Sequence, residues 1–204
     1  MAIRGGRPTW RAERRLVRLT MPFLAELFTL TQHAVSLAVL REQAVLYLET
    51  LYPPAYTSHI LRTSANAPAY CTAAGKILLA CDPGARYNAS RPGELQPLTE
   101  STITDGRELE RELNDARARG IALCRGEYLH GYDAVAAPIF GREDKAIASI
   151  TVSAPAALLD LDALVPLLRQ SAHSASLSVR SRGRLTPGLS HFSRRGPGSA
   201  HNAE

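Results

Sequence analysis

The residues best suited to chemistry lie in the segment 68–80, where small side chains lead into an apolar run with helical spacing. Thr72 can cap the start of that helix, because its hydroxyl can accept a hydrogen bond from a first-turn amide. The amides of Ala73, Ala74 and Gly75 would then be unpaired at the positive end of the helix, with no large side chain over them. Such a helix start can bind a carboxylate or a phosphate. The alternative is that small residues are present for close packing against a sheet.

The Gly75-Lys76 pair does not belong to a nucleotide-binding phosphate loop. That motif requires a glycine five residues before the Gly-Lys pair and a serine or threonine after the lysine. Tyr70 and Ile77 occupy those two positions. The sequence therefore does not predict nucleotide hydrolysis.

A second group of reactive side chains surrounds Cys124, with Glu127 and His130 three residues apart nearby. An enzyme hypothesis would make Cys124 a nucleophile and His130 its base. The neighbouring Arg125-Gly126 pair indicates an exposed loop, so we interpret these groups as surface polar residues and expect no catalytic activity. Cys71 beside the helix start could have a lowered pKa, because helix amides favour a thiolate, which would suit a redox sensor.

The three cysteines, Cys71, Cys81 and Cys124, have no paired spacing and no clustered histidine beside them. We therefore expect reduced thiols and neither a metal nor a cofactor. No apolar run approaches the roughly 20 residues of a membrane span, and no apolar signal segment follows the arginine-rich start. We expect a cytoplasmic protein with no membrane partner.

The net charge of +5 is concentrated at the two ends of the chain. Residues 1–18 carry six Arg and one Glu, and residues 180–204 carry five Arg and one Glu, so residues 19–179 carry −4. A nucleic-acid groove requires a basic face on the folded body. The mildly acidic body does not predict one, and the basic ends are interpreted as solvated.

The pattern along the chain predicts helices on either side of hairpins. We expect disordered ends at 1–10 and 183–204 and a first helix at 11–31, in which Pro22 marks a kink or a new helix start. Hydrophobic patterning predicts strands at 34–40, 45–51, 58–62, 121–124, 132–140 and 146–153. It predicts further helices at 72–80, at 106–119 with a Thr104 or Asp105 cap, and from Asp160 or Asp162 to about Arg182. The segments 82–98 and 126–130 are expected to be loops. Hairpins of this kind favour an α+β fold with a largely antiparallel sheet.

Several sequence blocks together resemble the effector-binding domain of the IclR (isocitrate lyase regulator) family of bacterial transcription factors. Thr72–Ala80 is similar to the family's TA-x-GKALLA block. A second block comprises Gly120-Ile121-Ala122, Glu127, Gly131 and Val135–Ile139. A third, Ala148–Pro155, is similar to A-A-(L/I)-S-V-S-G-P, and 22–40 resembles the linker helix and first strand. The resemblance covers roughly residues 20–180 in the family's order.

The resemblance implies a GAF-like fold, with a linker helix at 11–31 and an effector-binding domain at 32–182. It also implies a small-molecule effector and a homodimer or tetramer. From the resemblance we expect the family's winged helix-turn-helix domain to be missing from this sequence, because only about 20 residues precede the linker-like helix. DNA would then be contacted only through a missing or partner winged helix domain, for example that of a full-length IclR-type relative. A stand-alone ligand-binding or heterodimerising protein remains an alternative.

The resemblance also assigns pocket residues position by position. Cys124 lies where several family members have Asp, and Ala134 lies where they have Cys. Thr151 and Ser153 match hydroxyl positions on one strand face, since residues i and i+2 point the same way. The full expected effector site comprises His59, Tyr70, Cys71, Thr72, Ala73, Ala74, Gly75, Cys124, Tyr132, Ala134, Thr151 and Ser153. Without an Asp at 124, we expect an organic acid less polar than a sugar acid or 2-keto acid.

Overall fold

A computed structural model describes residues 8–57, 66–82 and 95–182 of this chain. Its main helices are α1 (Pro8–Thr31), α3 (Ala73–Cys81), α4 (Gly106–Arg119) and α5 (Leu161–Arg182). Its strands are β1 (Ala34–Arg41), β2 (Ala44–Leu51), β3 (Asn66–Pro68), β4 (Ala122–Arg125), β5 (Tyr132–Phe140) and β6 (Ala146–Pro155). Short 3-10 turns lie at Pro54–Tyr56, Arg142–Asp144 and Ala156–Leu158.

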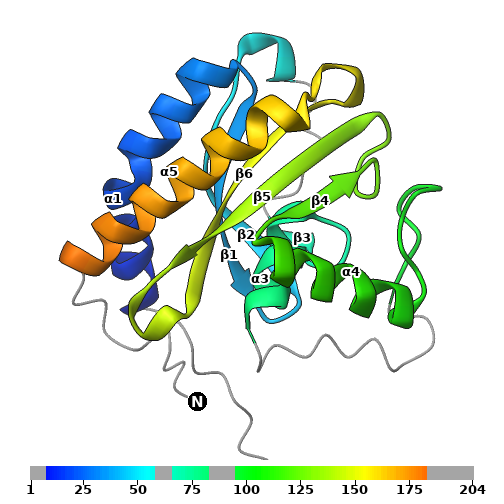
Figure 1. Cartoon of the computed structure of the whole chain (residues 1–204), viewed down its shortest axis with the longest axis horizontal. Helices are drawn as coiled ribbons and strands as arrows, with labels where there is room; N and C mark the ends of the chain where they lie inside the picture. Colours follow the sequence, from blue (N-terminus) through cyan, green and yellow to red (C-terminus); the bar gives the residue numbers. More distant parts are fainter. Residues whose placement is uncertain (1–7, 58–65, 83–94, 183–204) are drawn as a thin grey trace, which may run out of the picture.

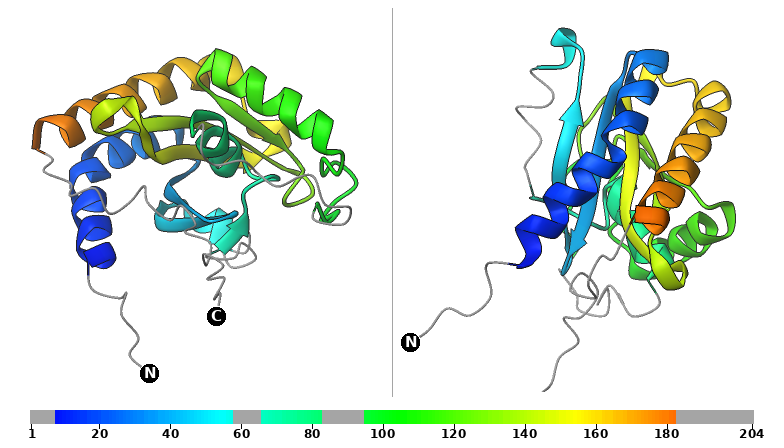
Figure 2. Two further views of the ribbon diagram at one scale, coloured as in Figure 1. Left: turned by 90° about the horizontal axis from the view of Figure 1, so that it is seen from below. Right: turned by 90° about the vertical axis from the view of Figure 1, so that its left-hand side faces the viewer.

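The strands form one antiparallel sheet in the order β3-β2-β1-β6-β5-β4. Helices α1 and α5 cover one face of this sheet, and α3 and α4 lie on the other (Figures 1 and 2). Strand β6 joins β3-β2-β1 to β5-β4, because it pairs with β1 on one side and with β5 on the other. This arrangement confirms the predicted α+β class.

Alternation along β5 and β6 assigns each face of the sheet to its helices. Val135, Ile150 and Val152 point into the main core, which also contains Leu24 of α1 and Leu168 of α5. The intervening residues point to the opposite face, beneath α3, as the period-two geometry of a strand requires. The α1 and α5 layer therefore contains the largest apolar cluster, whereas the sheet face beneath α3 carries small or polar side chains such as Ser36, Ala136 and Thr151.

Helix α1 departs from the sequence prediction at its start, and Pro22 lies within the helix and does not begin a second one. It begins at Pro8, so residues 8–10 are helical and not disordered, and it continues through Pro22 without a break. Pro22 removes the amide that would bond to the carbonyl of Arg18. Both residues are exposed, so water can solvate that carbonyl and the helix tolerates the proline.

Other boundaries differ by smaller amounts. Helix α4 has the predicted bounds: Asp105 is its cap, accepting a bond from the Glu108 amide at 2.9 Å, and Gly120 ends it in a left-handed conformation. Strand β6 runs two residues further than predicted, to Pro155. The short edge strand Asn66–Pro68 was not predicted, and the predicted strand 58–62 lies outside the described residues. Among the described residues, no helix is long and apolar enough to cross a lipid bilayer.

Candidate ligand site at the start of helix α3

The start of α3 has the predicted cap. Thr72 lies in an extended conformation, and its Oγ1 accepts a hydrogen bond from the Gly75 amide at 3.2 Å while donating to the Pro68 carbonyl at 3.1 Å. The first intrahelical bond runs from the Lys76 amide to the Thr72 carbonyl. The amides of Ala73 and Ala74 therefore have no intrahelical partner. The expectation that Gly75 also presents a free amide is wrong, because Thr72 uses it.

Gly75 has a packing role instead. A Cβ atom built on Gly75 would lie 2.2 Å from the Ala69 carbonyl oxygen. The backbone of Ala69 therefore occupies the space that a side chain at position 75 would need. Ala69 itself is fully buried and donates its amide to Gln43 in the β1–β2 turn. This contact fixes the position of α3 relative to the edge of the sheet.

The sheet face beneath α3 carries buried hydroxyl groups. Thr151 pairs with Ser36 on β1 and Ala136 on β5, and Ser153 lies two residues further on the same face, opposite Ala134. Thr151 is only 5% exposed, and its Oγ1 has no hydrogen-bond partner among the described residues. The structure therefore places Thr151, Ser153 and Ala134 together on the face that α3 covers. Their role as ligand contacts stays a prediction.

The two predicted site cysteines are buried donors and are not activated thiols. Cys124 Sγ lies 3.1 Å from the Cys71 carbonyl oxygen, to which it donates. Burial, with the charge of Glu127 as a further cause, raises the pKa of Cys124 to about 11. Burial, together with Cys124 and Glu127, raises the pKa of Cys71 to about 12. The suggested lowering of the Cys71 pKa is therefore wrong, and Cys124 is protonated at neutral pH, which opposes its role as a nucleophile.

A buried ion pair lies behind the helix start. Lys76 is fully buried, and its Nζ lies 2.6 Å from Glu127 Oε1 and 3.3 Å from the Leu123 carbonyl oxygen. Glu112 on α4 lies at 3.6 Å from the same nitrogen. The interpretation of Glu127 as a surface residue is wrong: it is 6% exposed, and this burial raises the pKa of its carboxyl, partly offset by Lys76. His130 is exposed, as expected.

The aromatic residues of the predicted site separate into different places. The Tyr70 hydroxyl donates to the Gln96 carbonyl at 2.6 Å, toward the segment before α4. Tyr132 stands edge-on to Tyr56, which in turn stacks on His33, so it belongs to an aromatic cluster at the end of the sheet. His59 lies outside the described residues.

Sequence reasoning missed Tyr47, which packs beside Ala74 on the same side of the sheet. Burial raises the pKa of its hydroxyl, and Cys124, Tyr128 and Cys71 are close enough to add to this effect. The alternation of Val45 and Tyr47 with Leu46 and Leu48 could have assigned Tyr47 to this face.

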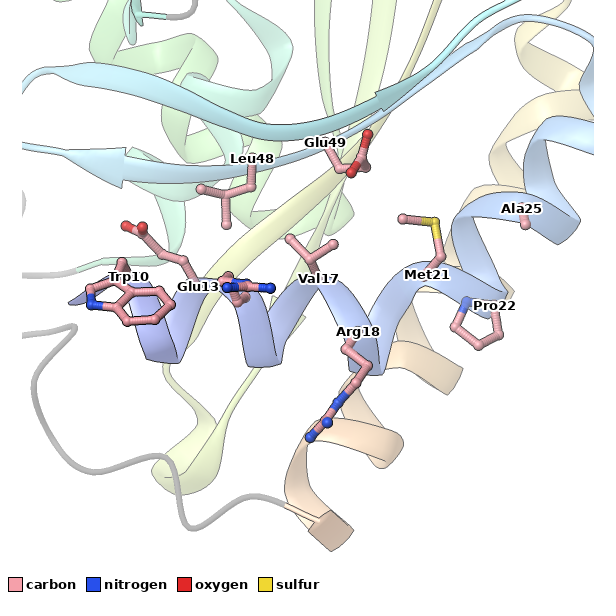
Figure 3. Close-up of a pocket in the computed structure, with 10 residues that line it drawn as sticks. Trp10, Glu13, Val17, Arg18, Met21, Pro22, Ala25, Leu48 and Glu49 are labelled. Atoms are coloured by element: carbon pink, nitrogen blue, oxygen red, sulfur yellow. The ribbon is translucent and has the colours of Figure 1, made fainter. Parts of the chain in front are cut away.

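A separate groove of about 740 Å³ lies between α1 and β2 (Figure 3). Val17 and Met21 of α1 point toward Leu48 and Glu49 of β2, while Arg18 points away from the strand. Because α1 and α3 cover opposite faces of the sheet, this groove is distinct from the α3 site. The sequence did not predict it.

The fold agrees with comparisons to known proteins. Residues 12–177 match the model of the bacterial transcriptional regulator IclR C-terminal family. The chain belongs to this family. It is 36% identical to the HTH-type transcriptional regulator Rv1719 of Mycobacterium tuberculosis, over 66% of this chain and 52% of that protein. It is 34% identical to the glycerol operon regulatory protein of Streptomyces griseus, over 60% of this chain and 48% of that protein.

Solved structures of IclR-type proteins share the fold. An IclR homologue from Microbacterium hydrocarbonoxydans, solved in complex with 4-hydroxybenzoate, superimposes with a TM-score of 0.76 and 26% identity, covering 88% of this chain and 72% of that one. The chain spans about half the length of these two curated relatives. These relatives are transcriptional regulators, so they give no support to the alternative of a cysteine enzyme.

Proposed function

We propose that this IclR-type domain senses a small organic acid at the start of α3. The amides of Ala73 and Ala74 would hold the carboxylate, and the hydroxyls of Thr151 and Ser153 would bind its other polar groups. The observation that carries this proposal is the buried Thr151 hydroxyl, which lies beneath α3 without a partner among the described residues. A buried hydroxyl without a hydrogen bond costs free energy, which a bound ligand would recover.

The charge distribution favours an acid with an apolar body. Among the described residues of this site, Lys76 is the buried cation. Its ammonium group is already bound by the Glu127 carboxylate and the Leu123 carbonyl. Carboxylate binding would therefore depend on neutral donors, and the neighbouring Cys71, Cys124 and Tyr47 supply a weakly polar wall. The 4-hydroxybenzoate complex of the structural neighbour supports an aromatic acid as the first compound to test.

The output would be a change of assembly. A ligand shifts an equilibrium only if it binds two states with different affinities. We infer that the two states are arrangements of a homodimer or tetramer in the bacterial cytoplasm, which alter DNA binding through a winged helix domain of the intact regulator or of a full-length partner. Light scattering with and without the acid measures this directly. A strict monomer under both conditions at high protein concentration would contradict the proposed output.

The binding proposal is tested by thermal denaturation with 4-hydroxybenzoate, benzoate and short aliphatic acids. At about one hundred times its dissociation constant, a ligand stabilises the folded state by roughly 2.7 kcal/mol. For a chain of this size, the melting temperature should rise by roughly 5–10 °C. Thr151→Val should keep the fold, because the hydroxyl it removes has no partner among the described residues, and should lose most of this shift.

The matched control is Thr29→Val, which removes an exposed hydroxyl on α1. It should keep the full ligand shift. An equal shift in the wild type and in Thr151→Val would place the ligand elsewhere, and no shift with any of these acids would contradict the proposed ligand class.

A further inference from the structure

The first turns of α1 present a row of arginines, although the charge pattern of the sequence predicts a solvated basic end there. Arg11, Arg14 and Arg18, here called the arginine ridge, are all exposed. Their spacing of three and four residues places them along one side of the helix. The axial rise from the first to the last is about 10 Å. Part of the terminal charge is therefore held in fixed positions on the folded body.

Trp10 organises one end of the ridge. The guanidinium carbons of Arg11 and Arg14 lie 5.6 and 5.5 Å from the centre of the indole ring. Both distances fall within the range of a cation–π contact. Trp10 is 43% exposed, and Arg11 and Arg14 are both exposed residues. The indole restricts two flexible side chains before any partner binds.

In the described part of the chain, acidic side chains do not pair with the ridge. Among the residues that the structure describes, none of the three ridge arginines forms a recorded ion pair. Glu13, the acidic residue between them, pairs with Arg41 on β1 instead. Glu49 of β2 borders the adjacent groove, whereas Arg18 points away from that strand (Figure 3).

We propose that the arginine ridge binds the phosphate backbone of duplex DNA without reading its sequence. Guanidinium groups match phosphate oxygens in geometry and charge, and they displace condensed counterions from DNA. Exposed arginines spaced along one side of a helix suit a regular array of phosphates, and the family acts in transcription. The ridge lies on the opposite layer from the α3 site, so this inference does not rest on the proposed effector.

The test is fluorescence anisotropy of the whole chain with a labelled, mixed-sequence duplex of about 20 base pairs, at potassium chloride concentrations from about 20 to 200 mM. The wild type is compared with Arg11→Gln/Arg14→Gln/Arg18→Gln. Each lost phosphate contact reduces the magnitude of the slope of log affinity against log salt by about 0.9. The slope of the triple variant should therefore be smaller in magnitude by about 2 to 3, and this variant should bind more weakly at low salt.

A matched control is Arg107→Gln/Arg111→Gln/Arg119→Gln, which removes the same charge from exposed positions on α4. It should keep the wild-type salt slope. The proposal is overturned if the wild type does not bind the duplex, if the ridge variant keeps the full slope, or if the α4 control loses as much. Preferential binding to vesicles of phosphatidylserine and phosphatidylcholine would instead assign the ridge to a membrane surface. Circular dichroism of both variants checks that α1 remains folded.

Discussion

At the residue scale, Lys76 and Glu127 form a buried ion pair next to α3. Taking two charges out of water costs several kcal/mol for each, and this cost is recovered only with close pairing and further hydrogen bonds. The 2.6 Å contact and the bond to the Leu123 carbonyl supply both. Neither partner could be paired from the sequence, because they are 51 positions apart.

Lys76→Met should lower the free energy of unfolding by about 3–5 kcal/mol at neutral pH, because it leaves the Glu127 carboxylate buried without its cation. The Glu127 pKa is raised above its usual 4.5, so the native state binds more protons than the unfolded state between these two values. Stability from this group therefore falls as pH rises through that window, and rises again on acidification. Lys76→Met also removes the cation that lowers the Glu127 pKa, so the stranded carboxyl takes up its proton at a higher pH than in the wild type, and the loss should shrink as the pH is lowered.

Urea denaturation at several pH values measures this effect. Glu112→Gln is the control, because its partly exposed carboxylate lies further from Lys76 and should contribute about 1 kcal/mol or less. A loss in Lys76→Met that stays constant with pH would contradict the assignment of Glu127 as the stranded charge.

The thiols give a second prediction at this scale. With pKa values raised to about 12 and 11, Cys71 and Cys124 should carry almost no thiolate at neutral pH. Iodoacetamide should therefore alkylate both far more slowly in the native chain than in urea. Half-buried Cys81 serves as the internal comparison and should react before them. Mass spectrometry of the digested protein identifies the labelled residue, and rapid native labelling of Cys71 would restore the redox-sensor hypothesis.

At the scale of elements, Gly75 determines how close α3 approaches the sheet. Alanine is normally about 1 kcal/mol better than glycine within a helix. At this position the added Cβ would lie 2.2 Å from the Ala69 carbonyl oxygen, and the Ala69 atoms that it meets belong to the backbone, which cannot rotate away. We expect Gly75→Ala to destabilise the fold by about 1–3 kcal/mol and to displace the helix start.

Gly120→Ala provides the comparison, since an added Cβ there meets nothing within 4 Å and costs only the strain of a positive φ, about 1–2 kcal/mol. Thermal denaturation ranks the two variants, and ligand titration separates them. Gly75→Ala should weaken binding of the acid, and Gly120→Ala should not. Unchanged affinity in Gly75→Ala would show that the position of α3 does not matter for the ligand.

Local signals explain which elements could be predicted. Helix α4 has a cap at Asp105 and a stop at Gly120, and the β5–β6 hairpin alternates clearly, so both elements could be located without distant information. Strand β3 is three residues long and exists because it pairs with β2, which no local pattern reveals. The site follows the same division: the Thr72 cap is local, whereas Tyr47 and the contacts of Glu127 depend on the fold.

At the scale of the whole molecule, the sheet separates the proposed acid site beneath α3 from the arginine ridge on α1. Sites with no shared contacts are expected to act independently within one domain. The acid should therefore leave duplex affinity unchanged at protein concentrations where the chain is a monomer. The ridge variant should keep its thermal shift with 4-hydroxybenzoate, and Thr151→Val should keep its salt-dependent binding to the duplex.

Coupling should emerge only when copies associate, because an assembly can place both sites under one change of arrangement. If the acid alters duplex affinity by some factor, the duplex must alter acid affinity by the same factor. Anisotropy titrations with and without acid, matched by calorimetric acid titrations with and without duplex, test this equality across protein concentrations. Coupling of equal size in the monomer would show that the signal crosses the sheet within one chain, and the assembly mechanism would be wrong.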